Sequence, residues 1–331
     1  MTGSTPRVRW GILSTAKIAR TTVIPAIQQS QHGEVTAIAS RDHAAATELA
    51  AELGIPTAYG SYDALLADPD VDAVYNPLPN HLHAEWTMKA ADEGKHVLCE
   101  KPLTLDASEA RALVAHCATA GVLLREAFMY RFHPQWLRTK ELVDSGAIGD
   151  LRAVQAWFSY YNDDPTNIRN IDDFGGGALM DIGCYPISVA RWLFAAEPDE
   201  VDAVMHRDAV SGVDTLTSAV LRFGTGHTTF TVSTQAEPYQ RVHVVGTAGR
   251  IEIEIPFNAP TDRPTRIFVT SGGRPPTDPA TTIEEFAPAD QYSLQADAFA
   301  AAVLEGRSAP LPPDDAASNM VVIDAVRAAA G

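Results

Sequence analysis

The sequence predicts two domains. An α/β domain with a doubly wound parallel sheet is expected over residues 1–127, and an α+β domain with an open, mainly antiparallel sheet over residues 128–331. A chain of 331 residues is long for one hydrophobic core and sufficient for two. In the first part short apolar runs alternate with helical patterns, which is typical of parallel strands joined by crossover helices. In the second part strand-like runs follow one another directly, which is typical of antiparallel pairing.

Six strands are expected in the first domain, at residues 7–13, 34–40, 57–59, 71–76, 95–99 and 122–127. The helices between them are expected at 16–28, 44–53, 81–93 and 106–120. A glycine follows directly after three of these helices, and a glycine in the left-handed conformation commonly ends a helix. These glycines are Gly54, Gly94 and Gly121.

The pattern changes after Ala127, where an aromatic and cationic segment leads into a helix expected at 134–145. The strands of the second domain are expected at 149–161, 200–206, 215–223, 227–234, 241–246 and 250–255. A polar loop rich in proline and glycine is expected over 261–279. Two closing helices are expected at 291–305 and 315–330.

The charge and the cysteine content exclude several classes of partner. A formal net charge of −17 argues against nucleic acid or an anionic membrane, although it leaves room for an anionic cofactor bound by local donors. No apolar run approaches the ~18–20 residues that a membrane span needs. Three cysteines without framework spacing indicate reduced thiols, and residues 1–6 carry no signal architecture. We therefore expect a cytoplasmic protein.

The turn after the first strand resembles a weak dinucleotide fingerprint. In place of the pattern G-x-G-x-x-G/A the chain has Ser14, Ala16 and Ala19. Small side chains still let a backbone approach a pyrophosphate at a helix amino terminus, where unpaired N–H groups favour anions. The cofactor contacts predicted here are Gly11, Ser14, Thr15, Ala16, Lys17 and Ile18.

The end of the second strand selects the dinucleotide. A carboxylate at this position bonds the ribose 2′-OH of NAD, whereas an arginine accommodates the 2′-phosphate of NADP. The chain has Ser40 and Arg41 here, and the guanidinium fork suits a phosphate, so NADP is favoured over NAD. Asp42 keeps NAD open, because a shift of one residue in the strand would bring a carboxylate to the ribose.

Two prolines follow the fourth strand and prevent an immediate helix, so this loop lies at the cofactor edge. Its predicted cofactor contacts are Pro77, Leu78, Asn80 and His83. A zinc site built from His81, His83 and Cys99 is an alternative interpretation. Residues i and i+2 do not share a helix face, so no metal is predicted.

The fifth strand ends on Glu100-Lys101-Pro102. Charge is expensive to bury unless it is paired or used, and Pro102 disfavours a helical backbone at Lys101. In an open α/β sheet, ligands bind at the carboxyl ends of the strands. We therefore place Glu100 and Lys101 at the cofactor, with Lys101 as the chemical centre.

A glycine run, Gly175 to Gly177, opens a helix in the second domain. Asp181 and Tyr185 follow it with a spacing of four, which puts a carboxylate and a phenol on one helix face. A buried and satisfied tyrosine in the first helical turns is the alternative interpretation.

The segments 100–102 and 175–185 resemble the motifs of the glucose–fructose oxidoreductase/inositol dehydrogenase family, called Gfo/Idh/MocA, over nearly the whole chain. Residues 130–134, 162–169 and Tyr185 are most similar to the aldose (xylose-type) and dihydrodiol dehydrogenase branch, because the inositol dehydrogenase branch has histidine at the last motif position. Ser14 and Ala16 depart from the fingerprint glycines. The resemblance implies a Rossmann domain and hydride transfer between NAD(P) and a sugar or polyol.

Under this hypothesis Tyr185 is the general acid/base. The Lys101 ammonium lowers the pKa of that phenol from its usual value of about 10, and Glu100 fixes Lys101. Asp181 orients the substrate hydroxyls. Further substrate contacts are predicted at Arg131, Asn162 and Arg169, each with a structural role as the alternative.

Three other functions remain open from the sequence: a keto-sugar reductase, an NAD-dependent glycosidase, and a non-catalytic NAD(P)-sensing protein on the same fold. The strands at 215–223 and 227–234 carry apolar residues on more than one face. Together with the resemblance, this predicts a homodimer or homotetramer through the sheet of the second domain.

Overall fold

The structure is a computed structural model that describes residues 6–224, 226–271, 281–307 and 313–331. The chain forms two compact units. The first comprises Met1–Met129 and Tyr292–Ala317, and the second comprises Tyr130–Gln291 and Ser318–Gly331. Two expectations concern residues outside the described ranges. They are the lack of signal architecture at the amino terminus, for residues 1–5, and part of the expected loop, for residues 272–279.

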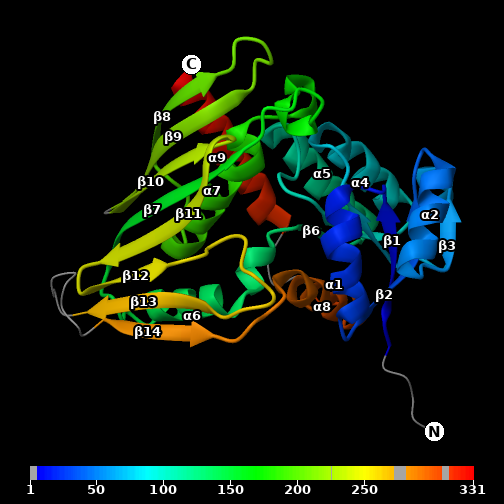
Figure 1. The fold of residues 1–331 in the computed structure, drawn as a ribbon, viewed down its shortest axis with the longest axis horizontal. Coiled ribbons are helices and arrows are strands. Elements are labelled where there is room, and N and C mark those ends of the chain that lie inside the picture. The colour runs from blue at the N-terminus through cyan, green and yellow to red at the C-terminus, as the bar shows by residue number, and fades with distance from the viewer. Residues whose placement is uncertain (1–5, 225, 272–280, 308–312) are drawn as a thin grey trace, which may run out of the picture. The chain divides into compact units, whose positions relative to one another are not determined.

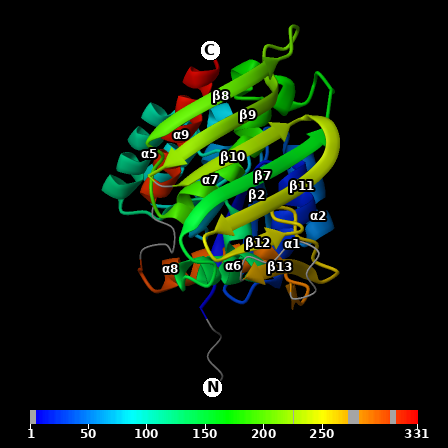
Figure 2. The ribbon, with the colours of Figure 1, turned by 90° about the vertical axis from the view of Figure 1, so that its left-hand side faces the viewer.

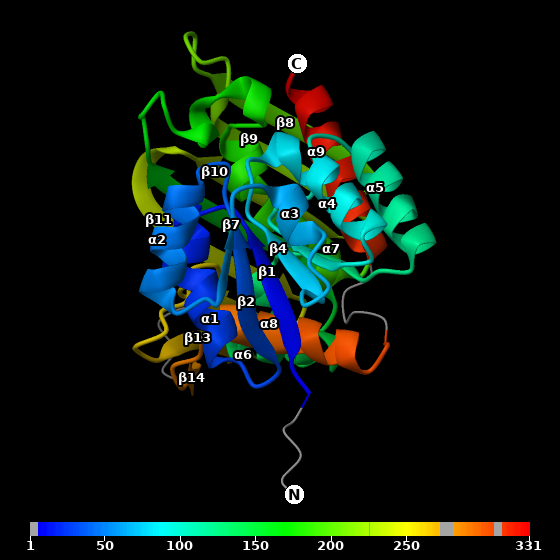
Figure 3. The ribbon, with the colours of Figure 1, turned by 90° about the vertical axis from the view of Figure 1, so that its right-hand side faces the viewer.

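The first unit contains the predicted parallel sheet, with strand order β3-β2-β1-β4-β5-β6. Its strands are β1 Val8–Leu13, β2 Gly33–Ala39, β3 Thr57–Tyr59, β4 Ala73–Asn76, β5 His96–Cys99 and β6 Leu124–Glu126. Its helices are α1 Ile24–Gln29, α2 His43–Leu53, α3 Tyr62–Leu66, α4 His83–Asp92, α5 Ala107–Ala120 and α8 Gln291–Leu304. Figure 3 shows α1 to α5 beside the central strands β1, β2 and β4. The prediction of a doubly wound sheet is confirmed.

Helix α8 corrects the expected domain division, which assigned the whole chain after residue 127 to the second domain. Phe299 of α8 is fully buried, with its ring centroid 5.1 Å from that of Trp10 in β1. The Asp297 carboxylate accepts from the backbone N–H groups of Gln31 and His32, at 2.8 and 3.0 Å. These contacts join segments more than 250 residues apart, so no local pattern in the sequence could indicate them.

The strand order brings three strand ends together at one edge of the sheet. Strand β4 pairs with β1, Tyr75 opposite Ile12, and with β5, Asn76 opposite Cys99. The backbone N–H of Glu100 also donates to the Asn76 carbonyl at 3.0 Å. The turns that follow β1, β4 and β5 are therefore neighbours, at the switch point where open α/β sheets bind ligands.

The second unit is built on an eight-stranded sheet of order β14-β13-β12-β11-β7-β10-β9-β8 (Figure 1). Within this sheet, β10–β7 is the one parallel pair among the described residues, so the prediction of a mainly antiparallel sheet is confirmed. The strands are β7 Leu151–Tyr161, β8 Glu200–Arg207, β9 Asp214–Phe223, β10 Gly226–Ser233, β11 Gln235–Gly246, β12 Gly249–Ile253, β13 Thr265–Ser271 and β14 Thr282–Phe286. The remaining helices are α6 Pro134–Asp144, α7 Cys184–Phe194 and α9 Pro313–Ala330.

One face of this sheet is turned to the viewer in Figure 2, and α7 lies behind it. None of the described helices is both long and apolar enough to cross a membrane.

The expected loop over 261–279 is wrong over residues 265–271, which form β13. The prolines and glycines of this region all lie outside residues 265–271. Ile267 is fully buried, because it pairs with Ile253 of the neighbouring strand. The strand is thus stabilised by a partner that local composition does not reveal.

Two expected regular helices begin with a wider π turn, at Ala19–Val23 and at Leu179–Gly183. A proline follows shortly after each turn, Pro25 in α1 and Pro186 in α7. Proline has no N–H to continue the α-helical hydrogen-bond ladder, which accounts for the irregular turn before it. The second turn contains Asp181, and Tyr185 follows it.

Candidate active site

The turn after β1 keeps a glycine-like backbone although it contains no glycine. Ser14 has φ 101°, a region that side-chain-bearing residues rarely adopt. Its Oγ accepts from the Ala16 N–H at 2.9 Å, and its own N–H donates to the Ala39 carbonyl at 2.8 Å. The replacement of the fingerprint glycine has therefore changed the residue and kept the shape of the turn.

Gly11 was predicted as a cofactor contact, but it lies inside β1. A Cβ at this position would come within 2.6 Å of the Leu65 side chain and 3.1 Å of Val71. The space that the glycine leaves is thus filled by the protein's own core, and we assign Gly11 a packing role. Thr15, Ala16 and Ile18 lie half-buried at the start of the helix, with Lys17 exposed beside them.

At the end of β2, Arg41 is exposed and lies beside Tyr62. Burial raises the pKa of Tyr62, and the Arg41 guanidinium opposes that rise. Asp42 is already engaged, because its carboxylate accepts from the N–H groups of Ala44 and Ala45 at 3.0 and 3.2 Å as the amino-terminal cap of α2. The Asp42 N–H in turn donates to Ser40 Oγ at 3.1 Å. This geometry favours the guanidinium over the carboxylate as the ribose-side group.

The segment after β5 is held by buried groups on its neighbours. Glu100 accepts from the Tyr75 hydroxyl at 2.7 Å and from the backbone N–H of Lys101 at 3.3 Å. The N–H of Leu103 donates to Glu126 at 2.8 Å. Burial, with the Glu100 carboxylate next, raises the pKa of Tyr75, so this phenol stays protonated and donates. Glu100 therefore fixes the backbone of Lys101, and the peptide bond that follows Lys101 is cis.

His83 was predicted as a cofactor contact, but the structure corrects this to an indirect role. The ring is fully buried, and its two nitrogens lie 2.9 Å from the Pro102 carbonyl and 2.7 Å from the Leu78 carbonyl. Burial lowers the pKa of His83 to about 4. The imidazole therefore lies between the loop after β4 and the segment after Lys101, and its neutral form has one N–H to donate to one of the two carbonyls. In that loop Leu78 is buried, while Asn80 is half-buried.

The described residues contain no group of three or more His, Cys, Asp or Glu side chains arranged to hold a metal ion. Cys99 lies fully buried, and burial raises the pKa of its thiol well above the usual range. His81 and His83 differ in exposure, since the first is half-buried.

In the second unit, Asp181 is the centre of a small polar cluster. Its Oδ2 accepts from the Tyr160 hydroxyl at 2.5 Å and lies 3.0 Å from Nε of Arg169. Tyr160 comes from β7, Arg169 from the short helix Ile168–Asn170, and Asp181 from the π turn. The structure thus brings together Asp181 and Arg169, both predicted from the sequence, and adds Tyr160, which the sequence analysis missed. The one sequence feature that could have indicated Tyr160 is the alternation of side chains along β7, which puts Tyr160 on the same face as Phe158.

Tyr185 is 5% exposed and is surrounded by aromatic rings. Its ring centroid lies 5.1 Å from that of Phe257, 5.7 Å from Phe158 and 5.9 Å from Tyr130. These contacts fix the plane of the phenol ring, and a fixed ring is what a proton-transferring group requires.

The other two predicted substrate contacts have structural partners. Arg131 is buried and donates to the Ser188 carbonyl and hydroxyl at 3.1 and 2.9 Å, over the ring of Trp192. Asn162 closes a turn by accepting from the Asp164 N–H at 3.1 Å. For both residues the structural alternative accounts for these contacts.

Asp214 in β9 is a second residue that the sequence analysis missed. It is 5% exposed, and its carboxylate accepts from the Leu179 N–H at 2.8 Å and the Thr217 hydroxyl at 2.6 Å. Gly177 has φ 106°, and a Cβ there would lie 2.1 Å from Asp214 Oδ1. The glycine is therefore required twice, by its backbone and by the carboxylate beside it, and Asp214 anchors the segment that carries Asp181.

The donor set at the carboxyl edge of the first unit fits a phosphorylated dinucleotide. The hydroxyl residues Ser14 and Thr15 follow β1 at the start of a helix, and Arg41 stands at the end of β2. Phosphates are bound in proteins by such backbone donors and by guanidinium groups.

Comparisons with known proteins agree with this arrangement. Residues 8–128 match a family model described as an oxidoreductase family with an NAD-binding Rossmann fold. Residues 136–252 match a model of the GFO/IDH/MocA C-terminal domain. Together the two matches cover most of the chain.

Individual relatives cover nearly the whole chain or three quarters of it. A D-xylose 1-dehydrogenase (NADP⁺) of Haloferax volcanii is 46% identical over 96% of this chain and 95% of its own. A trans-1,2-dihydrobenzene-1,2-diol dehydrogenase of Mus musculus is 36% identical over 75% of this chain and 74% of its own.

Among solved structures, a 3-ketoreductase of Actinomadura kijaniata in complex with NADP and TDP-benzene superposes with a TM-score of 0.90 at 33% identity, covering 98% of both chains. Solved variants of that ketoreductase have a tyrosine replaced by phenylalanine, or a lysine replaced by alanine or glutamate.

The strained turn predicts an unusual order of stability. Ser14→Gly should have a higher free energy of unfolding in urea than Ser14→Ala by roughly 1 kcal/mol. Both variants lose the hydroxyl that caps Ala16, but only alanine keeps the cost of a positive φ. Thr21, within the helical turn that follows, serves as the control. There the order should reverse, since glycine is worse than alanine in a helix by about 1 kcal/mol. Equal stability of the two Ser14 variants would contradict the strained turn.

Proposed function

The chain belongs to the GFO/IDH/MocA family of oxidoreductases, and from this premise we propose that it is an NADP-dependent dehydrogenase of sugars or polyols, most similar in activity to a xylose-type aldose or trans-diol dehydrogenase. The observation that carries the proposal is the Asp181 cluster beside a fixed and buried phenol, Tyr185. A carboxylate and a phenol are the groups that bind a polyol and move its hydroxyl proton.

NADP is the proposed cofactor because of the environment at the end of β2. Arg41 is exposed there, while the Asp42 carboxylate is committed to capping α2. The xylose dehydrogenase relative and the ketoreductase structure are both described with NADP, which supports the same choice. Ser14, Thr15, Ala16 and Lys17 are proposed to face the pyrophosphate, and Ser40 and Arg41 the ribose phosphate.

When bound, the nicotinamide supplies or accepts the hydride. The protein must then hold the sugar and handle one proton. Tyr185 is proposed as the general acid/base, Asp181 as the acceptor of substrate hydroxyls, and Lys101 as the cation that favours the phenolate. Glu100 and Tyr75 support this by fixing the Lys101 backbone. The tyrosine and lysine variants solved for the ketoreductase concern the same two residue types.

A keto-sugar reductase is the second candidate. The similarity to a 3-ketoreductase over the whole chain favours it, and the same groups would work in the opposite direction, with Tyr185 giving its proton to the carbonyl oxygen. The three cysteines are buried thiols outside any disulfide, and we propose a reducing, cytoplasmic location.

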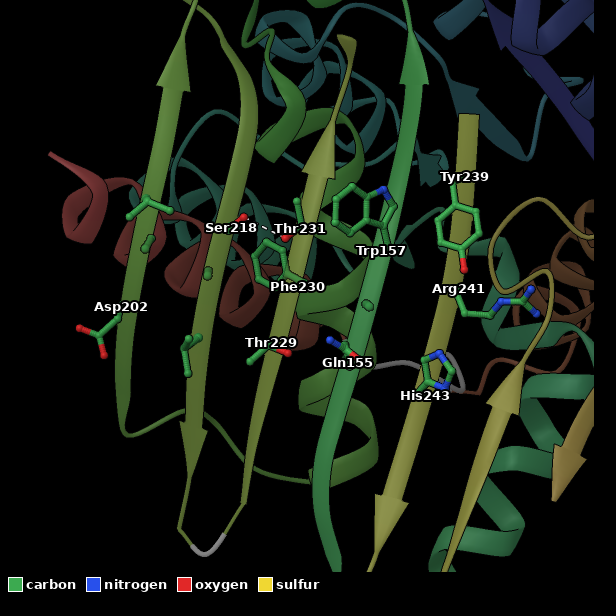
Figure 4. A pocket seen from close by; sticks show the side chains of 15 residues that line it. Gln155, Trp157, Asp202, Ser218, Thr229, Phe230, Thr231, Tyr239, Arg241 and His243 are labelled. Atoms are coloured by element: carbon green, nitrogen blue, oxygen red, sulfur yellow. Dashed lines mark hydrogen bonds between the residues drawn. The ribbon is translucent and has the colours of Figure 1, made fainter. Parts of the chain in front are cut away.

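We also propose that the chain assembles as a homodimer or homotetramer through the sheet face in Figure 4. Trp157, Val204 and Tyr239 are 40%, 70% and 50% exposed on this face. They surround a shallow hollow of about 510 Å³ that Arg241 and His243 also line. Exposed aromatic and aliphatic side chains on an open sheet are typical of an interface, and a second copy of the chain is the occupant we propose.

Loss of the proton-handling groups tests the main proposal. Lys101→Met and Tyr185→Phe should each lower the turnover of a reactive sugar roughly 10²–10⁴-fold, because general acid–base catalysis contributes about this much. NADPH binding, followed by its fluorescence, should stay nearly intact. The controls are Lys89→Met, which removes a partly exposed lysine paired with Glu85, and Tyr161→Phe, at an exposed position. Retention of more than about a tenth of the wild-type rate in either variant would remove that residue from the mechanism.

Arg41→Ala tests the cofactor. The substitution should weaken NADP binding about tenfold to a hundredfold and leave NAD binding unchanged, because only the 2′-phosphate uses the guanidinium. Arg20→Ala, which removes an exposed arginine paired with Glu52 in the same unit, should affect neither. An equal effect of Arg41→Ala on the two dinucleotides would refute the NADP assignment.

Light scattering at micromolar concentration tests the assembly. The wild type should have at least twice the mass of one chain, and Trp157→Glu should reduce it, because a charge in an apolar interface is costly. Val210→Glu is the matched control, since Val210 is 97% exposed in the turn between β8 and β9 and does not line the hollow. A wild-type protein with the mass of one chain would end the proposal.

A further inference from the structure

Strand β7 contacts both residues that we propose for proton transfer and substrate binding. Phe158 and Tyr160 lie two apart, so they point to the same face of the strand. Phe158 meets the Tyr185 ring edge-on at 5.7 Å, and the Tyr160 hydroxyl reaches Asp181 at 2.5 Å. Tyr161, the next residue, has the opposite environment, because it is 61% exposed and donates to Asp163 at 3.2 Å.

Two donors converge on one oxygen of Asp181. The Tyr160 hydroxyl and Nε of Arg169 both reach Oδ2, while the Asp181 side chain is only 12% exposed. Two donors from different directions fix the rotation of a carboxylate about its last bond. The second oxygen, Oδ1, consequently has a defined direction as well.

The two donors differ in how firmly they hold the Asp181 carboxylate. The Arg169 side chain is 42% exposed, so solvent and salt screen its charge and its long chain loses entropy when it is held in place. Tyr160 is half-buried on a strand in the middle of the sheet and has two side-chain torsions. The phenol is therefore the firmer of the two supports.

Tyr160 is also kept in its neutral form. Burial, followed by the adjacent Asp181 carboxylate, raises the pKa of Tyr160. A neutral phenol beside a carboxylate donates a hydrogen bond and takes no proton from a substrate at neutral pH. Tyr160, which reaches Asp181 from the sheet, and Tyr185, which follows Asp181 in the sequence, thus have different tasks. Proton transfer is left to Tyr185.

We propose that Tyr160 is a positioning residue for the substrate: its hydroxyl holds the Asp181 carboxylate in the orientation in which it accepts the hydroxyl groups of the sugar. This inference rests on the proposed dehydrogenase function. It adds a residue that acts through Asp181, and it predicts that the phenol contributes to sugar binding without contributing to cofactor binding.

Tyr160→Phe tests the inference. The variant keeps the ring and removes the donor, and a hydrogen bond to a charged group is worth about a tenfold to hundredfold change in an equilibrium. We expect kcat/KM for the sugar to fall by about this factor, mainly through a higher KM, and the dissociation constant of NADPH to stay unchanged. Tyr161→Phe removes the neighbouring exposed hydroxyl and should leave both constants within about twofold of the wild type.

A double-mutant cycle with Asp181→Asn separates positioning from a purely structural effect. If Tyr160 acts through Asp181, adding Tyr160→Phe to Asp181→Asn should lower kcat/KM no further. Additive losses, or a Tyr160→Phe enzyme with the KM of the wild type, would overturn the proposal. A loss of packing alone would lower the urea midpoint and appear equally in both backgrounds.

The cycle also distinguishes this inference from the proposed function. If the wild type transferred no hydride between NADP and any sugar or polyol, the proposed function would fail first. The free energies of unfolding of the wild type, the two single variants and the double variant would then test whether Tyr160 and Asp181 are coupled. Coupled residues give non-additive values, and independent residues give additive ones. Additive unfolding energies would show that Tyr160 does not hold Asp181.

Discussion

The pairing of β4 with both β1 and β5 is the constraint on which the first unit depends. Parallel pairing at these two edges puts the ends of three strands side by side, and the functional loops follow those ends. Buried polar groups then fix the loops. Tyr75 holds Glu100, and His83 lies between the Leu78 and Pro102 carbonyls. An unpaired buried carbonyl or carboxylate is costly, so these contacts give the edge one conformation.

In the second unit, a sheet and one irregular helix hold the segment that carries Asp181. Its π turn, which contains Asp181, leads into α7, and the two strands that flank β10 hold the turn in place. Asp214 of β9 receives the Leu179 N–H, and Tyr160 of β7 reaches Asp181 itself. Rigid strands position a side chain more firmly than loops do, and π turns occur frequently at functional sites. The glycine at 177 exists because the Asp214 carboxylate leaves no room for a side chain.

The turn after β1 keeps the backbone conformation of a glycine although its residues depart from the dinucleotide fingerprint. Ser14 adopts the positive φ that glycine would adopt at lower cost, and it gains a hydroxyl that caps Ala16. At the ribose end, the Asp42 carboxylate caps a helix and Arg41 remains exposed beside Tyr62. Both observations show how a small change in the sequence shifts the role of a neighbouring residue.

The sequence by itself determined the parallel sheet, the family and the short motifs, because strand–helix alternation and contiguous residues such as Glu100-Lys101-Pro102 are local properties. Only the tertiary structure decided which distant groups meet those motifs. Phe299 on Trp10, Tyr160 on Asp181 and Asp214 on Gly177 join elements far apart in the chain. The structure likewise turned His83 and Gly11 from expected cofactor contacts into internal supports, since burial and the surroundings of ring nitrogens are properties of the packed fold.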